Sequence, residues 1–446
     1  MIPELQALDA RPSVIRIPHQ IDVPLTARVK RLVDTDAFRR LSHVSQLGLV
    51  SFVYPGATHT RFEHSLGVYR NTLLFLRRLQ QDDFFATGIS DAEREAVLVA
   101  ALLHDIGHWP YCHPIEDIGL NGIPCHEDVS ATILQSAQFQ ELIEQDWQFE
   151  IPMLVRLIGN KPQTTAEKIL GSIISGPIDV DKMDYLYRDS LHCGVPYGMN
   201  FDAPRLINSI CLNQQQTGIA ITSKGKTAAE MLVFARYIMF SEVYWHHAVR
   251  SATAMLQRIF FDWHQRHADK CAPSSLSRLT DSSFAELMTQ SKDAVCCSGL
   301  LDGLFGGSRQ LYKRAIDYNA HQNPDIYQAL AHQPYERLAQ MAEQLAERLC
   351  SRLDLKIGPA ELLIDAPPIS LEVQFKVQIN DGSSADSLEN ISPVVNALAK
   401  QQFDDFVKRV RVFVHPELKP LLAAGAVDEC LREVVSGIAP SIDHSV

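Results

Sequence analysis

Apolar residues recur at three- and four-residue spacing through most of the first 350 residues, which is the period of amphipathic helices. The pattern predicts helices over 66–79, 92–108, 129–142, 166–174 and 227–261. Between about 265 and 310 the chain is rich in Ser, Asp and Gly, which indicates loops between short helices. The larger part of the chain is therefore expected to be helical.

Three segments have the alternation of apolar and polar residues that β-strands favour. Residues 208–222 predict a short hairpin, and residues 371–377 and 410–414 predict two strands on either side of a helix near 392–407. The expected fold class is mainly α. Residues 1–355 are predicted to form a helical bundle, and residues 356–446 a small α+β lobe.

The apolar run 96–103 ends abruptly at His104 and Asp105. If the helix continues to residue 108, His104 and His108 share one face, and Asp105 can reach the same metal ion from the side. The plainer alternative is a helix that ends before Pro110 with solvated polar residues in its last turn. For an isolated His-Asp pair, that alternative is the commoner case.

Three further segments contain the same residue types: 60–68, 113–127 and 179–185. A mononuclear catalytic site needs about four protein ligands and an open position for water. One His, the His-Asp pair and a distant Asp would supply those ligands, and helices can bring them together. The four segments together favour a metal site.

The order of these motifs resembles the HD-domain deoxynucleoside triphosphate triphosphohydrolases. The resemblance begins at 34–68 and continues through His104 to His108, His113, His126-Glu127 and 179–185, and it fades after about residue 320. It implies an HD-domain helical bundle and the hydrolysis of dNTPs to deoxynucleoside and inorganic triphosphate. In such a reaction a metal-bound hydroxide attacks the alpha phosphorus.

The resemblance implies four metal ligands, which are His64, His104, Asp105 and Asp181. Taken alone, His64 would be read as a surface histidine and Asp181 as a helix-capping aspartate. A bound metal lowers the pKa of its water and neutralises charge on the phosphate. Mixed imidazole and carboxylate ligands suit one divalent transition metal, which can be Fe, Mn, Zn or Ni, and additional Mg is possible.

The leaving group of this reaction needs a proton. The resemblance places His126 on the leaving oxygen as general acid, and a nearby carboxylate would favour its protonated form. Glu116 is the expected partner, although the family has an aspartate there, and Asp117 is the alternative. His108 and His113 would lie along the phosphates.

The residues implied to bind the substrate are Gln46, Leu47, Arg61, His113, Lys182, Tyr185, Asp189, Arg236 and Tyr244. Gln46 and Asp189 would bind the 3′-hydroxyl, and the ring of Tyr185 would crowd the 2′ position and so favour deoxyribose. Arg236 and Tyr244 lie in an aromatic-rich segment that can equally be helix core. The chain departs from the family at its activating-nucleotide site, where Ser42 replaces an arginine.

Composition narrows the setting of the protein. The net charge of −12 argues against a general nucleic-acid coat, so substrate phosphates must meet local positive charge. Nine cysteines without paired metal spacing indicate a reduced cytoplasmic interior. No apolar run approaches the roughly 20 residues of a membrane helix, and no signal peptide is evident. We expect a soluble protein that self-associates into a homo-oligomer.

Two other classes of function stay open. One is an HD enzyme for nucleoside monophosphates, cyclic nucleotides or nucleic acid, because the metal ligands are common to the superfamily. Lys182, Arg236 and Tyr244 favour a triphosphate over these substrates. The other is a non-catalytic nucleotide-sensing subunit, which would be expected to have lost a ligand or His126. The sequence keeps both.

Overall fold

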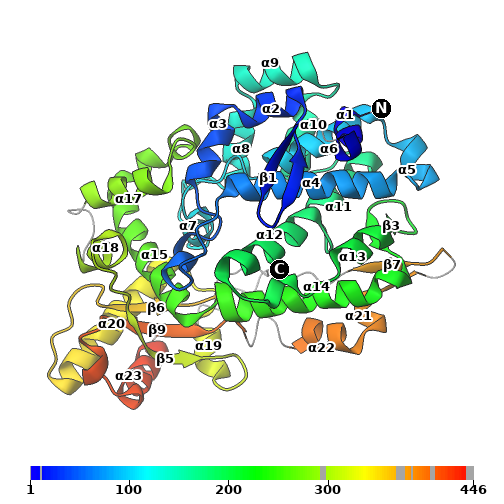
Figure 1. The fold of residues 1–446 in the computed structure, drawn as a ribbon. Coiled ribbons are helices and arrows are strands. Elements are labelled where there is room, and N and C mark those ends of the chain that lie inside the picture. Colours follow the sequence, from blue (N-terminus) through cyan, green and yellow to red (C-terminus); the bar gives the residue numbers. More distant parts are fainter. Residues whose placement is uncertain are drawn as a thin grey trace.

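The computed structural model describes residues 2–10, 13–291, 298–367, 377–382, 385–401 and 407–437. Helices dominate the molecule, as the sequence predicted (Figure 1). The helices up to residue 267 are α1 (Pro3–Ala10), α2 (Ala27–Val33), α3 (Asp36–Arg40), α4 (Arg61–Leu79), α5 (Asp83–Gly88), α6 (Asp91–Leu103), α7 (Cys112–Glu116), α8 (His126–Leu134), α9 (Ala137–Asp146), α10 (Ile151–Ile158), α11 (Thr165–Ile174), α12 (Val180–Cys193), α13 (Ala203–Ser209), α14 (Lys226–Ile238) and α15 (His247–His267).

The later helices are α16 (Pro273–Leu276), α17 (Asp281–Gln290), α18 (Ser298–Phe305), α19 (Pro324–Leu330), α20 (Tyr335–Leu353), α21 (Leu388–Ile391), α22 (Pro393–Gln401) and α23 (Ala424–Ser436). Short 3-10 turns are η1 (Leu41–His43), η2 (Gly48–Phe52), η3 (Tyr197–Met199), η4 (Ser223–Gly225), η6 (Ala268–Cys271) and η9 (Lys419–Leu421). One π-helical segment is η5 (Met239–Tyr244). The strands are β1 (Val14–Ile17), β2 (Ile21–Pro24), β3 (Ile210–Leu212), β4 (Ile219–Ile221), β5 (Lys313–Tyr318), β6 (Leu362–Asp365), β7 (Gln378–Asn380), β8 (Ala385–Ser387) and β9 (Val410–Val414).

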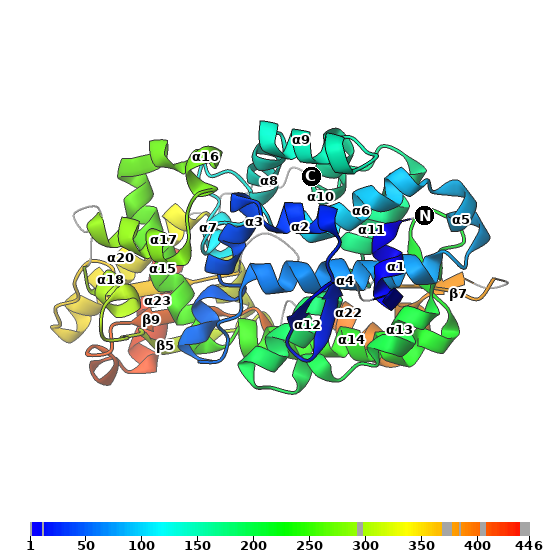
Figure 2. The ribbon, with the colours of Figure 1, turned by 45° about the horizontal axis from the view of Figure 1, so that its top comes forward.

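Helix α6 forms the centre of the core. Its residues from Arg94 to Leu103 are all buried, because α4, α10 and α11 cover it. Ser90 caps its first turn and accepts a hydrogen bond from the backbone N–H of Glu93, whose carboxylate in turn accepts one from the Ser90 backbone. Helix α4 lies against α6 on one side and α12 on another (Figure 2). These contacts bring the ends of three helices to one place.

Three predicted helices are interrupted. The helix predicted to reach residue 108 ends at Leu103, and residues 104–108 form tight turns instead. Gly107 lies in these turns against α8, where an added Cβ would be 2.2 Å from the carbonyl oxygen of His126. The segment 129–142 divides into α8 and α9, and 227–261 divides into α14, η5 and α15. The apolar pattern continues across the last two breaks because the residues on both sides are buried, although α14 packs in the core around α6 and α15 mainly in a second core.

The hairpin predicted at 208–222 is confirmed. Strands β3 and β4 pair antiparallel, with Ile210 opposite Ile221. Strand β7 then pairs parallel to β4 through Ile379, and β8 completes a four-stranded sheet. Residues 371–376 of the strand predicted at 371–377 lie outside the described residues. The β1–β2 hairpin near the N-terminus was not predicted.

A small α+β lobe is confirmed, but it begins before residue 356. Its sheet has the order β5-β9-β6, and β9 is buried along its whole length because a strand pairs on each side. Helix α20 packs on β6 and α23, and α23 also contacts β5 (Figure 1). A buried ion pair between Arg250 of α15 and Asp365 of β6, with Nη2 to Oδ1 at 2.6 Å, fastens this lobe to the bundle.

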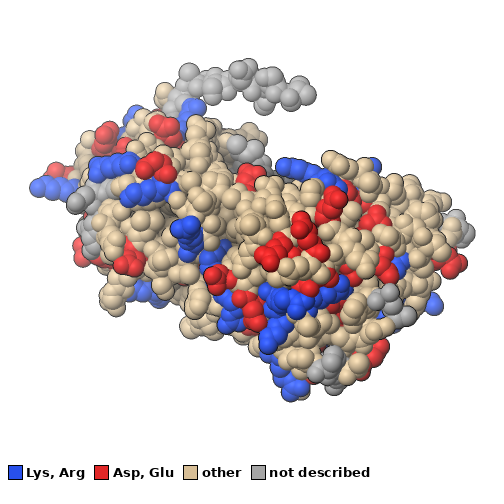
Figure 3. All heavy atoms as spheres, turned by 90° about the horizontal axis from the view of Figure 1, so that it is seen from above, with Lys and Arg blue, Asp and Glu red and all other residues tan. Residues whose placement is uncertain are grey.

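The outer surface mixes both signs of charge. On the face drawn in Figure 3, acidic and basic side chains are interspersed. Of the helices in the described ranges, none is both long enough and apolar enough to pass through a bilayer.

Candidate metal centre and active site

Four side chains from α4, the turn after α6 and the first turn of α12 converge on one point. We call them the HD cluster, and they are His64, His104, Asp105 and Asp181. The Nε2 atoms of His64 and His104 are 3.3 Å apart, and Nε2 of His64 is 3.0 Å from Oδ1 of Asp181. Nε2 of His104 is 3.3 Å from Oδ1 of Asp105. Metal bonds of about 2.0–2.2 Å put neighbouring ligands at about this spacing, so the cluster can hold one divalent ion.

The imidazoles are oriented to expose their Nε2 atoms. Nδ1 of His64 is 2.8 Å from Oδ2 of Asp184, and Nδ1 of His104 is 2.9 Å from the carbonyl oxygen of Ala101. Such partners fix the ring of a metal-binding histidine and leave its other nitrogen for the metal. Burial acts to lower the pKa of His64, but its hydrogen bonds with Asp181 and Asp184 raise it to about 10. A cation in the cluster would take the place of that proton.

Asp184 is itself held by a buried guanidinium. Arg188, one turn later on α12, donates from Nε and Nη2 to the two oxygens of Asp184 at 2.8 and 2.7 Å. Its Nη1 donates to Glu63 of α4 at 2.6 Å. Gly67 allows this approach, since an added Cβ would lie 1.9 Å from Oδ1 of Asp184. The glycine in the sequence His64-Ser-Leu-Gly67 is thus required by close helix packing.

Asp105 links the HD cluster to the rest of the site. Its Oδ2 accepts from Nη1 of Arg61 at 2.8 Å, and its Oδ1 is 3.2 Å from Nδ1 of His108. Burial raises the pKa of Asp105, but His104, His108 and Arg61 outweigh burial and hold it well below its usual range. Asp105 is therefore an ionised carboxylate, which is the form that can bind a metal ion.

His126 and Glu116 form the predicted pair beside the cluster. Nδ1 of His126 is 3.1 Å from Oε2 of Glu116, and the His126 backbone N–H donates to Oε1 at 2.9 Å. Burial lowers the pKa of His126, but the carboxylate of Glu116 outweighs burial and raises it. The ring centroids of His108 and His126 are 4.0 Å apart. Burial and the nearby Arg61 lower the pKa of His108. Glu116 therefore contacts His126 although its side chain is one methylene longer than the aspartate of the family. Asp117, the alternative partner, lies in the wall of a cavity.

A cavity of about 500 Å³ opens beside Arg61, and we call it the site cavity. The predicted substrate residues in its wall are Gln46, Leu47, Arg61, His113, Arg236 and Tyr244. Among the described residues, the buried Oε1 of Gln46 has no hydrogen-bond partner, so it can accept one from a ligand. Trp245 and Arg250, which sequence reasoning did not select, complete the wall next to the lobe.

Three predicted substrate residues lie on α12 and are not part of that wall. Nζ of Lys182 is 2.5 Å from Oδ2 of Asp179, so it forms an ion pair within its own helix turn. The phenol of Tyr244 donates to Oδ2 of Asp189 at 2.6 Å, and Oδ1 of Asp189 is 2.8 Å from Nε2 of His59. Burial raises the pKa of Tyr185 to about 12. The partners His59, Asp184 and Arg188 were not predicted, since polar spacing alone does not show which side chains meet.

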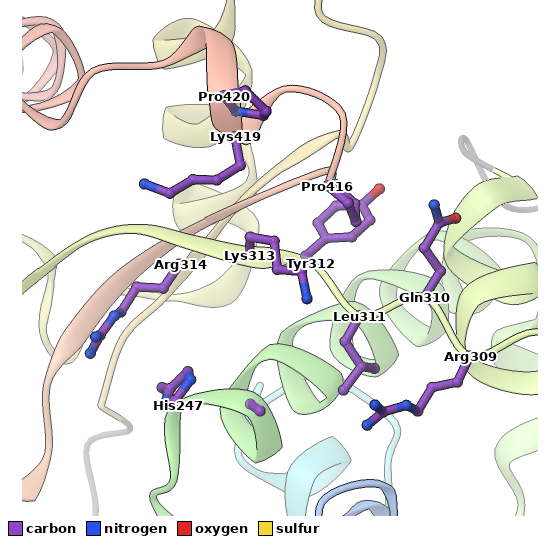
Figure 4. Close-up of a pocket in the computed structure, with 11 residues that line it drawn as sticks. His247, Arg309, Gln310, Leu311, Tyr312, Lys313, Arg314, Pro416, Lys419 and Pro420 are labelled. Atoms are coloured by element: carbon purple, nitrogen blue, oxygen red, sulfur yellow. The ribbon is translucent and has the colours of Figure 1, made fainter.

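A second cavity, of about 680 Å³, lies where the lobe meets the start of α15 (Figure 4). The basic residues in its wall are His247, Arg309, Lys313, Arg314 and Lys419. None of the residues predicted for the active site lines it. Positive charge is therefore gathered in two hollows, and the HD cluster adjoins the smaller one.

Comparison with known proteins agrees with this geometry. Residues 61–166 match the HD domain, and residues 201–432 match the HD associated region. The chain is 30% identical to the uncharacterized protein MJ1154 of Methanocaldococcus jannaschii, over 86% of this chain and 76% of that one. It is also similar to a solved structure of a hypothetical protein from Aquifex aeolicus, with 27% identity, a TM-score of 0.71, and 94% and 99% of the two chains covered.

Human deoxynucleoside triphosphate triphosphohydrolase SAMHD1 is 29% identical, over 49% of this chain and 39% of its own length. The match to the HD associated region spans more than half of the chain. The protein belongs to the HD-domain family related to the dNTP triphosphohydrolases. Its class is that of the metal-dependent phosphohydrolases.

Removing two ligands of the HD cluster should empty it. After reconstitution with Mn²⁺, the double variant His104→Ala/Asp105→Ala should retain no stoichiometric manganese and no hydrolytic activity, with its helical circular dichroism largely unchanged. Metal analysis after desalting decides this. A matched double variant at exposed positions, Asp36→Ala/His43→Ala, should keep both metal and activity. Full manganese content in the first variant would locate the site elsewhere.

The Glu116 carboxylate should set the alkaline limit of turnover. Because Glu116 raises the pKa of His126, the acid form persists to higher pH and is lost as pH rises through that value. Glu116→Gln should move the alkaline limb of the kcat profile down by about one pH unit or more. Asp117→Asn is the control and should leave the limb in place. A shift in the control alone would assign the partnership to Asp117.

Proposed function

We propose that the protein hydrolyses deoxynucleoside triphosphates to deoxynucleoside and inorganic triphosphate. The observation that carries the proposal is the His126–Glu116 pair next to the HD cluster, at a cavity whose wall contains Arg61 and Arg236. This combination offers a metal site, a proton donor and fixed cations in one place. A non-catalytic sensor would not need the proton donor.

The phosphate end of the substrate would lie along the basic side of the cavity. A divalent ion in the HD cluster would lower the pKa of a water and neutralise charge on phosphate oxygens. Arg61 is buried and oriented by Asp105, so its guanidinium is a preorganised donor for charge that grows in the transition state. Lys182 and Arg236 lie close enough to interact electrostatically and would hold the outer phosphates.

The reaction consumes one water: its oxygen goes to the alpha phosphorus, the proton it loses passes to solvent, and His126 regains a proton from solvent after donating its own. A bond forms between a water oxygen and the alpha phosphorus, while the bond from that phosphorus to O5′ breaks. His126, held in its charged form by Glu116, would give its proton to O5′. The deoxynucleoside leaves with a hydroxyl, and the three phosphates leave together.

The sugar would be bound by groups from α12, from η5 and from the loop between η1 and η2. Gln46 offers a free buried acceptor to the 3′-hydroxyl, and Asp189 is held by Tyr244 and His59 close to it. Tyr185 stays a neutral phenol at physiological pH, and its ring would stand against C2′. A ribose would meet steric cost and an unsatisfied hydroxyl.

The setting of the protein is part of the proposal. The seven cysteines in the described ranges are all free thiols, which supports a reducing, cytoplasmic location. We further propose that the chain acts as a homo-oligomer and that the metal is Fe, Mn, Zn or Ni, with Mg²⁺ accompanying the substrate.

The products test the choice of bond. Each dNTP should yield deoxynucleoside and intact triphosphate, without a nucleoside diphosphate intermediate. In oxygen-18 water, the label should appear in the triphosphate, because water attacks phosphorus and the C5′–O bond survives. Mass spectrometry of both products measures this. Stepwise release of orthophosphate, or turnover of monophosphates or cyclic nucleotides only, would remove the triphosphohydrolase assignment and leave the metal site standing.

Tyr185 should govern the choice of sugar. Tyr185→Ala should reduce the ratio of dNTP to NTP turnover by about tenfold or more, since removal of the ring admits a 2′-hydroxyl. The measurement is the ratio of the kcat/KM values for dGTP and GTP, and for the corresponding dNTP and NTP of each other base. Tyr187→Ala, two residues along the same helix, should leave the ratio unchanged. An unaltered ratio in the first variant would show that another group excludes ribose.

A further inference from the structure

A second group of metal-ligating side chains lies beside the HD cluster. We call it the histidine–cysteine cluster, and its members are His108, Cys112, His113 and His126. One donor atom from each lies within 4.8 Å of the donors of the other three. The Nε2 atoms of His108 and His113 are 3.2 Å apart. In a tetrahedral site with bonds of about 2.0–2.3 Å, neighbouring donors are about 3.3–3.8 Å apart, so small side-chain rotations suffice.

The cluster is held by separate pieces of local structure. Nδ1 of His108 lies 3.2 Å from Oδ1 of Asp105, and its ring contacts those of His113 and His126. Cys112 is the first residue of α7, is almost wholly buried, and borders the site cavity. Nδ1 of His126 is engaged by Glu116, which is the carboxylate–histidine arrangement that orients metal ligands elsewhere. The donors are thus preorganised at a place that solutes can reach.

The two clusters differ in the chemistry of their donors. The HD cluster has two imidazoles and two carboxylates, whereas the histidine–cysteine cluster has three imidazoles and a thiol. A thiolate with imidazoles favours Zn²⁺ and related borderline-soft ions over Mg²⁺ and Mn²⁺. Because Asp105 contacts His108, the two sites adjoin in one active site.

We propose that the histidine–cysteine cluster binds one Zn²⁺ ion, with Cys112 as a thiolate ligand, and that this ion inhibits the enzyme. Binding releases two protons to solvent, one from the thiol of Cys112 and one from the imidazolium of His126, and no oxidation or reduction is involved. The inhibitory half rests on the proposed function. A metal on the ring of His126 removes the proton that the leaving group needs, and it occupies the side of the cavity where His113 would meet phosphate.

Zinc binding can be measured without substrate. In a His104→Ala/Asp181→Ala background, which lacks two ligands of the HD cluster but keeps Asp105 beside His108, the chain should retain one zinc after desalting, and addition of Cys112→Ser should remove it. Zinc X-ray absorption of the double variant should show one sulfur among nitrogen neighbours. Co²⁺ should give a thiolate charge-transfer band that Cys112→Ser abolishes. Zinc retained in the triple variant, or no sulfur in the absorption spectrum, would overturn the proposal.

Inhibition is measured on Mn²⁺-loaded enzyme, with each variant compared to its own zinc-free rate. Cys112→Ser should raise the zinc concentration for half inhibition by about tenfold or more. Cys125→Ser changes an exposed cysteine next to His126 and should leave that concentration unchanged. Equal inhibition of all three proteins would refute the regulatory half. If dNTPs are not hydrolysed, the zinc stoichiometry and cobalt band still decide the metal site, so the two failures are distinguishable.

Discussion

The arrangement of the site depends on the contacts of the Asp184 carboxylate with His64 and Arg188. This carboxylate is buried between α4 and α12, where it receives two hydrogen bonds from Arg188 and fixes Nδ1 of His64. A buried charge is tolerated only when it is paired and hydrogen-bonded, and here both conditions are met. The Asp184–Arg188 pair lies within α12, and it connects to α4 because Asp184 contacts His64 and Arg188 donates to Glu63. Gly67 makes room for it, since a side chain there would displace the carboxylate.

The end of α6 shows how a stable core positions reactive groups. The helix is buried along its last three turns, and it ends at the residue before His104. His104 and Asp105 thus follow directly on the buried end of α6 but lie where backbone turns let them face α4 and α12. Besides its place in the HD cluster, Asp105 contacts Arg61 and His108, so a guanidinium and an imidazole surround one ionised carboxylate.

The lobe is connected to the site cavity through Arg250. Trp245 and Arg250 border the site cavity, and Arg250 also pairs with Asp365 in the lobe. The guanidinium of Arg250 lies 4.4 Å from the ring centroid of Trp245, a cation–π distance. Arg250 therefore belongs both to the cavity wall and to the contact that attaches the lobe. A movement of the lobe would change the position of this part of the wall.

The sequence by itself determined the class of fold, the hairpin at 210–221, the strand at 410–414, and the residue types of a metal site. These follow from local periodicity and from the ligand preferences of metals, which need no knowledge of neighbours. Only the tertiary structure decided that α6 stops at Leu103 and that β5 and α20 belong to the lobe, whereas the contact of Glu116 with His126 is the one expected from the sequence. The tertiary structure alone brought Cys112 to the three histidines and Arg188 to Asp184. The hydropathy pattern along the chain indicates which side chains are buried. The partner of a buried polar group depends on packing between segments far apart in the sequence, so neighbouring residues do not reveal it.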